Sequence, residues 1–309
     1  MPEFSIVIPA YNRERLLARA IQSCLAQHGA DFEIVVVDDG STRPIACLIE
    51  SLGNPRIKLI RHEDNRGHAA ARNSGVSAAQ GEWVVMLDSD DELLPGALAY
   101  MSSLIAELGS ATDRFAFMYR RDDGGVSPSP PMRCEHTGYA AALRALEDRT
   151  YFDFLQCIRR SVFDTLRWHE WKCAGAVLFQ MDFPRLFRTY TSSEILGLVH
   201  TDAPDRVSWQ RRARAYALRA GLDCGEEMDQ ILARHGEALA QHAPRTLERF
   251  LRVRASYFFL VGARVAGIRQ SLRCLRASPL SLETWLQLVA GLAGPDIFAR
   301  FRSMRAPPT

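Results

Sequence analysis

The sequence predicts an α/β protein in which a doubly wound sheet domain is followed by an all-helical region. Over the first 110 residues, four short apolar runs alternate with segments of helical periodicity. Continuous apolar runs are typical of parallel strands that are covered on both faces. From about residue 206 onward only helical periodicity remains. We therefore expect two domains, 1–205 and 206–309, in this chain of 309 residues.

The expected elements of the sheet domain follow one another at regular spacing. Four apolar runs are expected to be strands: Phe4–Ile8, Phe32–Val37, Ile57–Ile60 and Trp83–Leu87. Three segments are expected to be helices: Arg15–Leu25, a segment through Leu48 and Leu52, and the Ala-rich Ala69–Ala79. Residues 120–137 are rich in Gly, Pro and Ser and are expected to form a loop.

In the C-terminal region, apolar residues recur with the period of a helix. Four stripes are expected to be helices: Ala213–Leu222, Met228–Leu239, Leu247–Arg269 and Leu282–Leu292. Pro244, Pro279 and Pro295 stand at plausible breaks between helices. The region is also basic, because residues 205–309 carry a net charge of +8 whereas residues 1–110 carry −6.

Composition and cysteine usage narrow the class of protein. With 47% hydrophobic and 24% charged residues, the chain has a globular composition. We expect no signal peptide, because Met1–Pro9 lacks a basic stretch followed by a long apolar one. The longest apolar stretches are too short to span a bilayer. The seven scattered cysteines indicate reduced thiols and a cytoplasmic location, with contact to the inner face of the plasma membrane left open.

Polar residues gather where the expected strands end, and in a doubly wound sheet this is the edge that binds ligands. The four strand ends carry Pro9–Asn12, Asp38–Ser41, His62–Arg66 and Asp88–Asp91. Two carboxylates spaced as in Asp88-Ser89-Asp90 can reach one Mg²⁺ or Mn²⁺ ion, which then bridges a pyrophosphate. A carboxylate in Asp38-Asp39 can accept a hydrogen bond from a nucleobase or a ribose hydroxyl. Tyr11 can stack on a base. Turn, cap or packing roles are the structural alternatives for these residues.

In combination, these motifs closely resemble the family 2 glycosyltransferases, which have the GT-A fold. The resemblance is carried, in order, by Ser5–Asn12, Glu33–Thr42, Asn65–Gly67 with Ala71–Asn73, and Leu87–Asp91. It is strong over residues 3–110, weaker to about residue 208, and vague beyond. It implies a catalytic domain over 1–205, with a nucleotide-sugar-binding half at 1–110 and an acceptor half at 111–205.

The resemblance also assigns roles to single residues. Those expected to contact the nucleotide-sugar donor are Pro9, Ala10, Tyr11, Asn12, Asp38, Asp39, Arg72, Asp88 and Ser89. Among them, Asp39 would face a uracil-like N–H and Asp38 would support its turn. Asp90 would bind the metal, Mn²⁺ or Mg²⁺, with Asp91 and His200 nearby.

The family's general base is usually the Asp of a Glu-Asp pair, which this sequence lacks. Asp182 takes the Asp position, but Met181 replaces the Glu. Glu170 in Trp168–Trp171 is the alternative base. The departure at Met181 puts acceptor orientation in doubt.

The activity implied is metal-dependent, inverting transfer of a sugar from a nucleotide-diphosphate sugar, with UDP-sugars favoured, to an acceptor hydroxyl. The expected setting is bacterial surface polysaccharide or glycoconjugate synthesis. A degenerate module that binds a nucleotide or acts as a scaffold is the alternative. A sugar nucleotidyltransferase is disfavoured because Pro9–Arg13 is not a Gly-rich phosphate loop.

The partners expected are a nucleotide-sugar donor and a saccharide or lipid-linked acceptor. Nucleic acid is not expected, because no basic and aromatic interleaving is present. Arginines at 211–219 and 245–254 suggest peripheral membrane contact through the C-terminal helices. A solvated face of a helical bundle is the alternative interpretation of these arginines.

Overall fold

The computed structural model describes residues 2–147, 154–172, 174–200, 214–277 and 279–304. The chain forms two compact units. The first comprises Met1–Glu170 and Asp182–Ala203, and the second comprises Trp171–Met181 and Pro204–Thr309. The segment Trp171–Met181, which the sequence analysis placed in the acceptor half, thus groups with the C-terminal helices.

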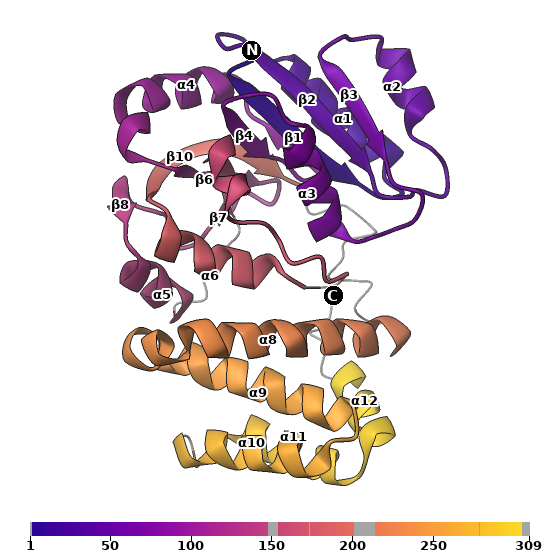
Figure 1. The fold of residues 1–309 in the computed structure, drawn as a ribbon, viewed down its shortest axis with the longest axis vertical. Helices are drawn as coiled ribbons and strands as arrows, with labels where there is room; N and C mark the ends of the chain where they lie inside the picture. The colour runs from indigo at the N-terminus through magenta and orange to yellow at the C-terminus, as the bar shows by residue number, and fades with distance from the viewer. Residues whose placement is uncertain (1, 148–153, 173, 201–213, 278, 305–309) are drawn as a thin grey trace. The chain divides into compact units, whose positions relative to one another are not determined.

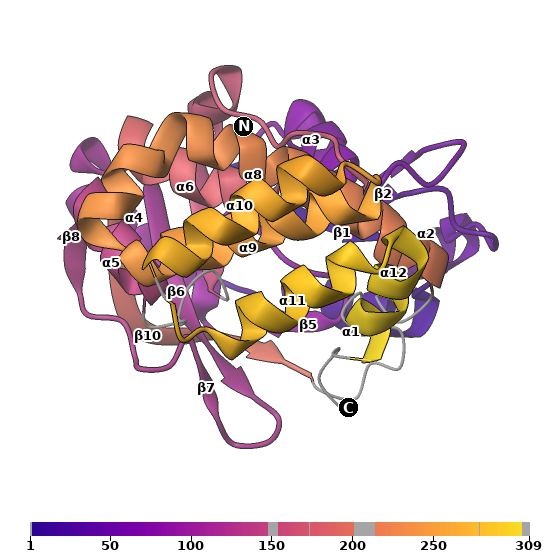
Figure 2. The ribbon, with the colours of Figure 1, turned by 90° about the horizontal axis from the view of Figure 1, so that it is seen from below.

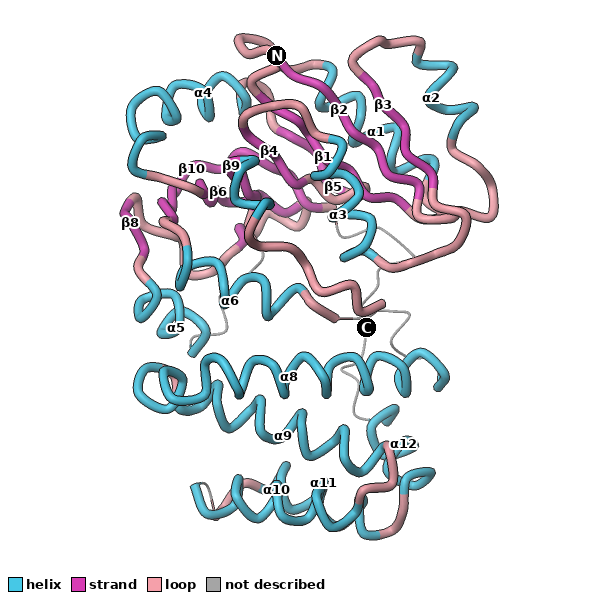
Figure 3. The backbone as a smooth tube through the Cα atoms, in the orientation of Figure 1, coloured by secondary structure: helices cyan, strands magenta, loops and turns pink. Residues whose placement is uncertain are grey.

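The described part of the first unit is built on one ten-stranded mixed sheet (Figure 3). The path through the sheet is β3-β2-β1-β4-β9-β6-β10-β5, with β7 beside β6 and β8 beside β10. The strands are β1 (Phe4–Ala10), β2 (Phe32–Asp38), β3 (Ile57–Arg61), β4 (Trp83–Met86), β5 (Asp91–Leu93), β6 (Arg114–Arg121), β7 (Val126–Ser127), β8 (Glu135–Thr137), β9 (Leu155–Arg159) and β10 (Thr189–Val199).

The four expected strands are confirmed as β1 to β4, and they pair in parallel. β1 lies between β2 and β4, with Phe4 beside both Phe32 and Trp83. Chain order therefore reverses at β1, which creates the switch point where doubly wound sheets bind ligands. The carboxyl ends of β1, β2 and β4 meet at this edge, so the tertiary fold brings the predicted donor residues together.

Helices cover both faces of the parallel strands (Figure 1). The described helices of the first unit are α1 (Glu14–Leu25), α2 (Ala46–Leu52), α3 (His68–Ala78), α4 (Ala97–Leu108), α5 (Tyr139–Glu147) and α6 (Ala176–Leu186). The first residues of α6, up to Met181, belong to the second unit. Two 3₁₀ turns, η1 (Gly109–Ala111) and η2 (Arg160–Asp164), complete the list. Leu17 and Ile21 of α1 pack with Ile6 of β1 in the main core. α3 covers the other face, where Gly75 lies against Val7 and Val37.

The remaining strands extend the sheet beyond β4. β9 pairs antiparallel with β4 and β6, and β10 runs parallel to β6 and antiparallel to β5. The expectation of a loop over 120–137 was incomplete. β6 continues to Arg121, β7 returns along it, and β8 pairs with the start of β10. Backbone hydrogen bonds to a neighbouring strand order these segments despite their turn-rich composition.

The described part of the second unit is helical, as expected. Its helices are α8 (Arg214–His242), α9 (Pro244–Leu260), α10 (Arg264–Ala277), α11 (Leu282–Leu292) and α12 (Pro295–Met304). The two stripes expected before residue 240 belong to one helix, because Gly225 lies against the ring of Tyr257 and does not break α8. The single stripe expected over Leu247–Arg269 is two helices, because Gly262 takes a positive φ of 78° and ends α9.

None of the described helices combines the length and apolar character needed to cross a bilayer. Six of the seven cysteines lie in the described part, and all six are free thiols.

Gly40, in the turn after β2, allows a stability test of this edge. Its φ is +71°, and a Cβ would meet the backbone carbon of Asp64 at 2.4 Å. Gly40→Ala should therefore lower the free energy of unfolding by about 3 kcal/mol or more. Gly53→Ala is the matched control, because its φ is +54° but a Cβ meets nothing closer than 3.9 Å. It should cost only about 1–2 kcal/mol. Urea unfolding followed by circular dichroism measures both, and equal losses would contradict the packing argument.

Candidate active site

Two buried carboxylates close the end of β2. Asp38 is fully buried, and its Oδ1 accepts a hydrogen bond from the backbone N–H of Ser41 at 2.9 Å. Its Oδ2 forms an ion pair with Arg61, whose other amino group donates to the Ser41 carbonyl at 3.0 Å. Both oxygens of Asp38 therefore stabilise the Asp38–Ser41 turn.

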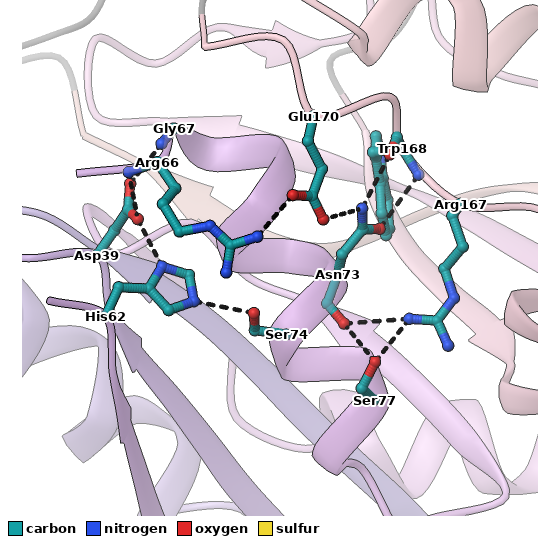
Figure 4. A network of polar contacts seen from close by, with 10 residues as sticks. All are labelled: Asp39, His62, Arg66, Gly67, Asn73, Ser74, Ser77, Arg167, Trp168 and Glu170. Atoms are coloured by element: carbon teal, nitrogen blue, oxygen red, sulfur yellow. Dashed lines mark hydrogen bonds and ion pairs between the residues drawn. The ribbon is translucent and has the colours of Figure 1, made fainter. Parts of the chain in front are cut away.

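Asp39 sits in a cradle of donors from the loop after β3 (Figure 4). Oδ1 accepts from Arg66 N–H at 3.0 Å and lies 2.7 Å from His62 Nδ1. Oδ2 accepts from Gly67 N–H at 2.8 Å. His62 Nε2 lies 2.9 Å from Ser74 Oγ on α3. Asp39 thus ties β2, the loop and α3 together, and Oδ2 can accept one more hydrogen bond.

The end of β1 is clamped to the same turn. Asn12 has a positive φ of 54°, and its N–H donates to Ser41 Oγ at 2.9 Å. Its side-chain oxygen accepts from the N–H and the hydroxyl of Thr42 at 2.9 and 3.0 Å. This clamp leaves Tyr11 36% exposed at the ligand edge, while Ala10 beside it is buried. The ring of Tyr11 is therefore available for stacking.

Arg72 and Asp88 form an ion pair beside an aromatic ring. Arg72 Nη2 lies 2.9 Å from Asp88 Oδ1, and its guanidinium is 5.9 Å from the centre of the Trp168 ring. Burial raises the pKa of Asp88, but Arg72, His68 and Arg13 together outweigh this effect and hold that pKa below its usual value. Trp168 is buried and stacks on Phe163 with ring centres 5.5 Å apart. No role in the site was expected for Trp168 from the sequence.

The acidic turn after β4 is held by arginines. Asp90 Oδ2 lies 2.8 Å from Arg13 Nη1, and the Asp90 carbonyl accepts from Arg19 at 3.0 Å. Ser89 and Asp91 are buried in the turn. Asp91 is paired with Val199 across β5 and β10, so His200 follows at the Asp90 end of β5. This register brings His200, which is 108 positions beyond Glu92 in the sequence, to the acidic turn.

Asp90, Asp91 and His200, predicted to bind metal, are not a preformed centre. Across the described ranges, no three His, Cys, Asp or Glu side chains are close enough to hold an ion. His200 Nε2 instead lies 2.5 Å from Glu92 Oε1, and Asp90 faces Arg13. Carboxylate oxygens and an imidazole suit Mn²⁺, so the donor chemistry fits even though the geometry is incomplete. Glu92 was not among the residues expected at the site, although it is only two residues beyond Asp90.

Asn73 clamps the segment that passes over α3 (Figure 4). Its Oδ1 accepts from the N–H of Trp168 at 3.2 Å, and its Nδ2 donates to the Trp168 carbonyl at 2.8 Å. Nδ2 also donates to Glu170 Oε1 at 3.1 Å, while Glu170 Oε2 lies 2.7 Å from Arg66. An open groove of about 750 Å³ is lined by Ile60, by α3 at Asn73, Ser74 and Ser77, and by Arg167–Glu170. Asn73 belongs to the motif Ala71–Asn73, and His62 belongs to the strand end His62–Arg66. Their positions in the sequence do not reveal which residues they contact.

The residue predicted to be the general base, Asp182, lies on α6 and is buried. Burial raises the pKa of the Tyr139 phenol. Arg185 lowers this pKa and Asp182 raises it, so both charged residues lie near Tyr139. Pro184 lies within the same helix. The structure thus places Asp182 in a buried, charged environment on α6.

Comparisons with known proteins agree with this arrangement. The family model Glycosyl transferase family 2 matches residues 5–166, slightly more than half of the chain. The succinoglycan biosynthesis protein ExoO of Rhizobium meliloti is 44% identical over 101 residues, 33% of this chain and 29% of ExoO. The GalNAc(5)-diNAcBac-PP-undecaprenol beta-1,3-glucosyltransferase of Campylobacter jejuni is 39% identical over 102 residues, 32% of this chain and 33% of that protein. Each match thus spans about a third of the relative's length.

Solved structures share the fold over most of the chain. The S. aureus TarS 1–349 structure in complex with UDP-GlcNAc has a TM-score of 0.60 at 18% identity, and the match covers 96% of this chain and 89% of that one. The mannosyltransferase PcManGT from Pyrobaculum calidifontis, in complex with GDP-Man and Mn²⁺, has a TM-score of 0.56 at 18% identity, over 99% and 88%. Both likenesses concern the fold, which is the expected GT-A fold with a C-terminal helical region. Because the family model matches more than half of the sequence and its motifs meet at one sheet edge, the chain belongs to glycosyl transferase family 2.

Proposed function

We propose that this protein transfers a sugar from a nucleotide-diphosphate sugar to an acceptor hydroxyl, with inversion, in the synthesis of a bacterial surface polysaccharide or glycoconjugate. The observation that carries the proposal is the meeting of the Asp39 cradle, the Arg72–Asp88 pair and the Asp88–Asp91 turn at the switch point of the sheet. The name of ExoO refers to succinoglycan biosynthesis, which supports the polysaccharide setting.

A uridine nucleotide fits the base end of this site best. Tyr11 is exposed beside Ala10 and can stack on the base. Asp39 Oδ2 can accept a hydrogen bond from an imide N–H such as that of uracil, which thymine shares. Arg72 is held beside Asp88 and can reach the nucleotide. The UDP-GlcNAc complex of TarS supports this choice.

Asp90, with Asp91 and His200 nearby, would hold Mn²⁺ or Mg²⁺ in this proposal. A divalent ion neutralises the negative charge that develops on the departing nucleoside diphosphate. In the structure Arg13 forms an ion pair with Asp90. When the donor binds, Arg13 would leave that carboxylate and contact a pyrophosphate oxygen. Glu92 would orient His200, whose Nε2 it contacts at 2.5 Å.

The general base that takes the proton from the acceptor hydroxyl is assigned to Asp182. Its rival Glu170 has one oxygen beside Arg66 and the other bonded to Asn73, so it serves as a structural link. Asp182 is a buried carboxylate on a helix that follows this link in the chain. A base at this position would act on a hydroxyl presented to the sugar carbon.

The acceptor we propose is a saccharide, either free or lipid-linked. The Campylobacter relative is named for a substrate linked to undecaprenol, which supports the lipid-linked form. The cytoplasmic location and nearness to the inner face of the plasma membrane stay predictions.

A catalytically degenerate nucleotide-binding or scaffold module is the second candidate. Met181 stands where the family usually has Glu, and it is buried. Nucleotide binding without turnover on any plausible acceptor would favour this alternative.

Metal removal should abolish donor chemistry. We expect EDTA to stop the release of nucleoside diphosphate from a nucleotide sugar, and added Mn²⁺ or Mg²⁺ to restore it. Asp90→Ala should lose metal-dependent donor binding in calorimetric titrations, whereas Glu107→Gln, an exposed carboxylate on α4, should bind normally. A broad donor panel that gave neither binding nor hydrolysis with either metal would overturn the proposed function.

Asp182→Asn should separate binding from transfer. The amide keeps the size of the side chain but cannot accept a proton, so donor affinity should persist while transfer falls by about 100- to 10,000-fold. Glu170→Gln should keep most of the transfer activity. Retained turnover in Asp182→Asn would clear Asp182 of the base role.

Trp168→Leu should weaken donor binding without slowing the chemical step. Loss of the ring beneath Arg72 removes a cation–π contact, so the KM for the donor should rise by roughly 3- to 10-fold with kcat unchanged. Trp168→Phe should restore much of the affinity. A folded Trp168→Leu protein with an unchanged KM would show that the ring does not position Arg72.

A further inference from the structure

The second unit exposes an apolar helix face for which the transferase chemistry has no use. On α11, Leu282, Trp285, Val289 and Leu292 are 69%, 47%, 63% and 53% exposed. At 3.6 residues per turn, these four positions fall within an arc of about 80°. They therefore form one continuous apolar stripe along the helix.

The buried side of α11 carries two polar residues beside the apolar Leu288 and Ala290. Thr284 and Gln287 are 1% and 7% exposed, and Gln287 Nε2 donates to the carbonyl of Arg252 at 2.9 Å. A helix that packs on a protein core usually buries its apolar residues and exposes its polar ones. A helix that buries two polar residues while it exposes four large apolar ones indicates that the outward stripe is covered by something other than water.

α10 enlarges the stripe into a surface. It lies beside α11, as Figure 2 shows, and its outward positions include Val265 and Leu272, 73% and 45% exposed. Leu280, between the two helices, is 96% exposed. We use the term α10–α11 face for the six residues Val265, Leu272, Leu282, Trp285, Val289 and Leu292.

The charges around this face are mainly positive. The exposed arginines from residue 261 to residue 300 are Arg264, Arg269, Arg273, Arg276 and Arg300. Over the same range the acidic residues are Glu283 and Asp296, and Glu283 lies 3.4 Å from Arg252. On α10, Arg269 and Arg276 share the helix face of Val265 and Leu272. An apolar stripe with tryptophan and flanking arginines complements an anionic lipid surface.

The arginines that the sequence suggested for membrane contact, at 211–219 and 245–254, are not the ones that lie beside exposed apolar side chains. Arg252 lies 3.0 Å from Glu248, and Arg254 forms an ion pair with Asp229, so both are engaged within the unit. Arg211 and Arg212 lie outside the described residues. Exposed arginines and exposed apolar side chains occur together on α10 and α11 instead.

We propose that the α10–α11 face binds the surface of an anionic phospholipid bilayer. Leu282, Trp285, Val289 and Leu292 enter the interfacial region, and Arg269 and Arg276 contact lipid phosphates. This inference concerns the second unit alone and does not depend on the proposed sugar transfer.

The first test is co-flotation of the full chain with vesicles. We expect binding to vesicles of phosphatidylcholine with 30% phosphatidylglycerol, and at least a tenfold smaller bound fraction with phosphatidylcholine alone or in 0.5 M salt. The variant Leu282→Ser/Trp285→Ser/Val289→Ser changes only exposed positions. Its bound fraction should be at least ninefold smaller than that of the wild type. Leu186→Ser, at an exposed apolar position on α6, and Arg144→Gln, at an exposed arginine on α5, are the matched controls and should bind like the wild type.

A second measurement reports the depth of Trp285 directly. Lipids brominated along their acyl chains should quench part of the tryptophan emission of the wild type, and Trp285→Phe should still bind but lose that quenching. Failure to float with anionic vesicles would overturn the proposal. Light scattering tests the competing occupant: a stable dimer that the triple Ser variant dissociates would assign the face to a second copy of the chain and likewise overturn the proposal.

Discussion

The buried carboxylates of Asp38 and Asp39 are the interaction on which the ligand edge depends. A charge removed from water is tolerated only when it is paired or hydrogen-bonded. Asp38 satisfies this requirement with Arg61 and Ser41, and Asp39 does so with His62 and the N–H groups of the following loop. The need to satisfy two adjacent charges thereby fixes how β2, β3 and α3 meet.

The rest of the site is attached to this anchor in layers. Asn12 clamps the end of β1 to the β2 turn, which sets the position of Tyr11. Asn73 on α3 clamps the Trp168 backbone, and Trp168 in turn lies beneath Arg72. Short polar contacts therefore carry the geometry outward from the carboxylates to the residues that would touch a nucleotide. The acidic turn after β4 is held separately by Arg13 and Arg19.

The two units illustrate different uses of burial. In the sheet unit, apolar strands are buried and polar groups gather at one edge, where a small charged ligand can be bound. In the helical unit, α11 buries Thr284 and Gln287 and exposes Leu282, Trp285 and Val289. An inward core of Phe259, Leu288 and Phe298 is formed without the outward apolar residues. That surplus is the physical basis for assigning them to a partner surface.

The sequence by itself determined the parallel half of the sheet, its helices and the family. Apolar runs and helical stripes are local signals, and each motif at a strand end spans only a few residues. Proline marked breaks between helices, but only the tertiary structure decided that Gly225 lies within α8 while Gly262 ends α9. Only the tertiary structure paired Arg13 with Asp90, His200 with Glu92 and Asn73 with Trp168, because these contacts join residues up to 108 positions apart. It also decided which face of α11 meets solvent, since periodicity defines a stripe but not the side on which the core lies.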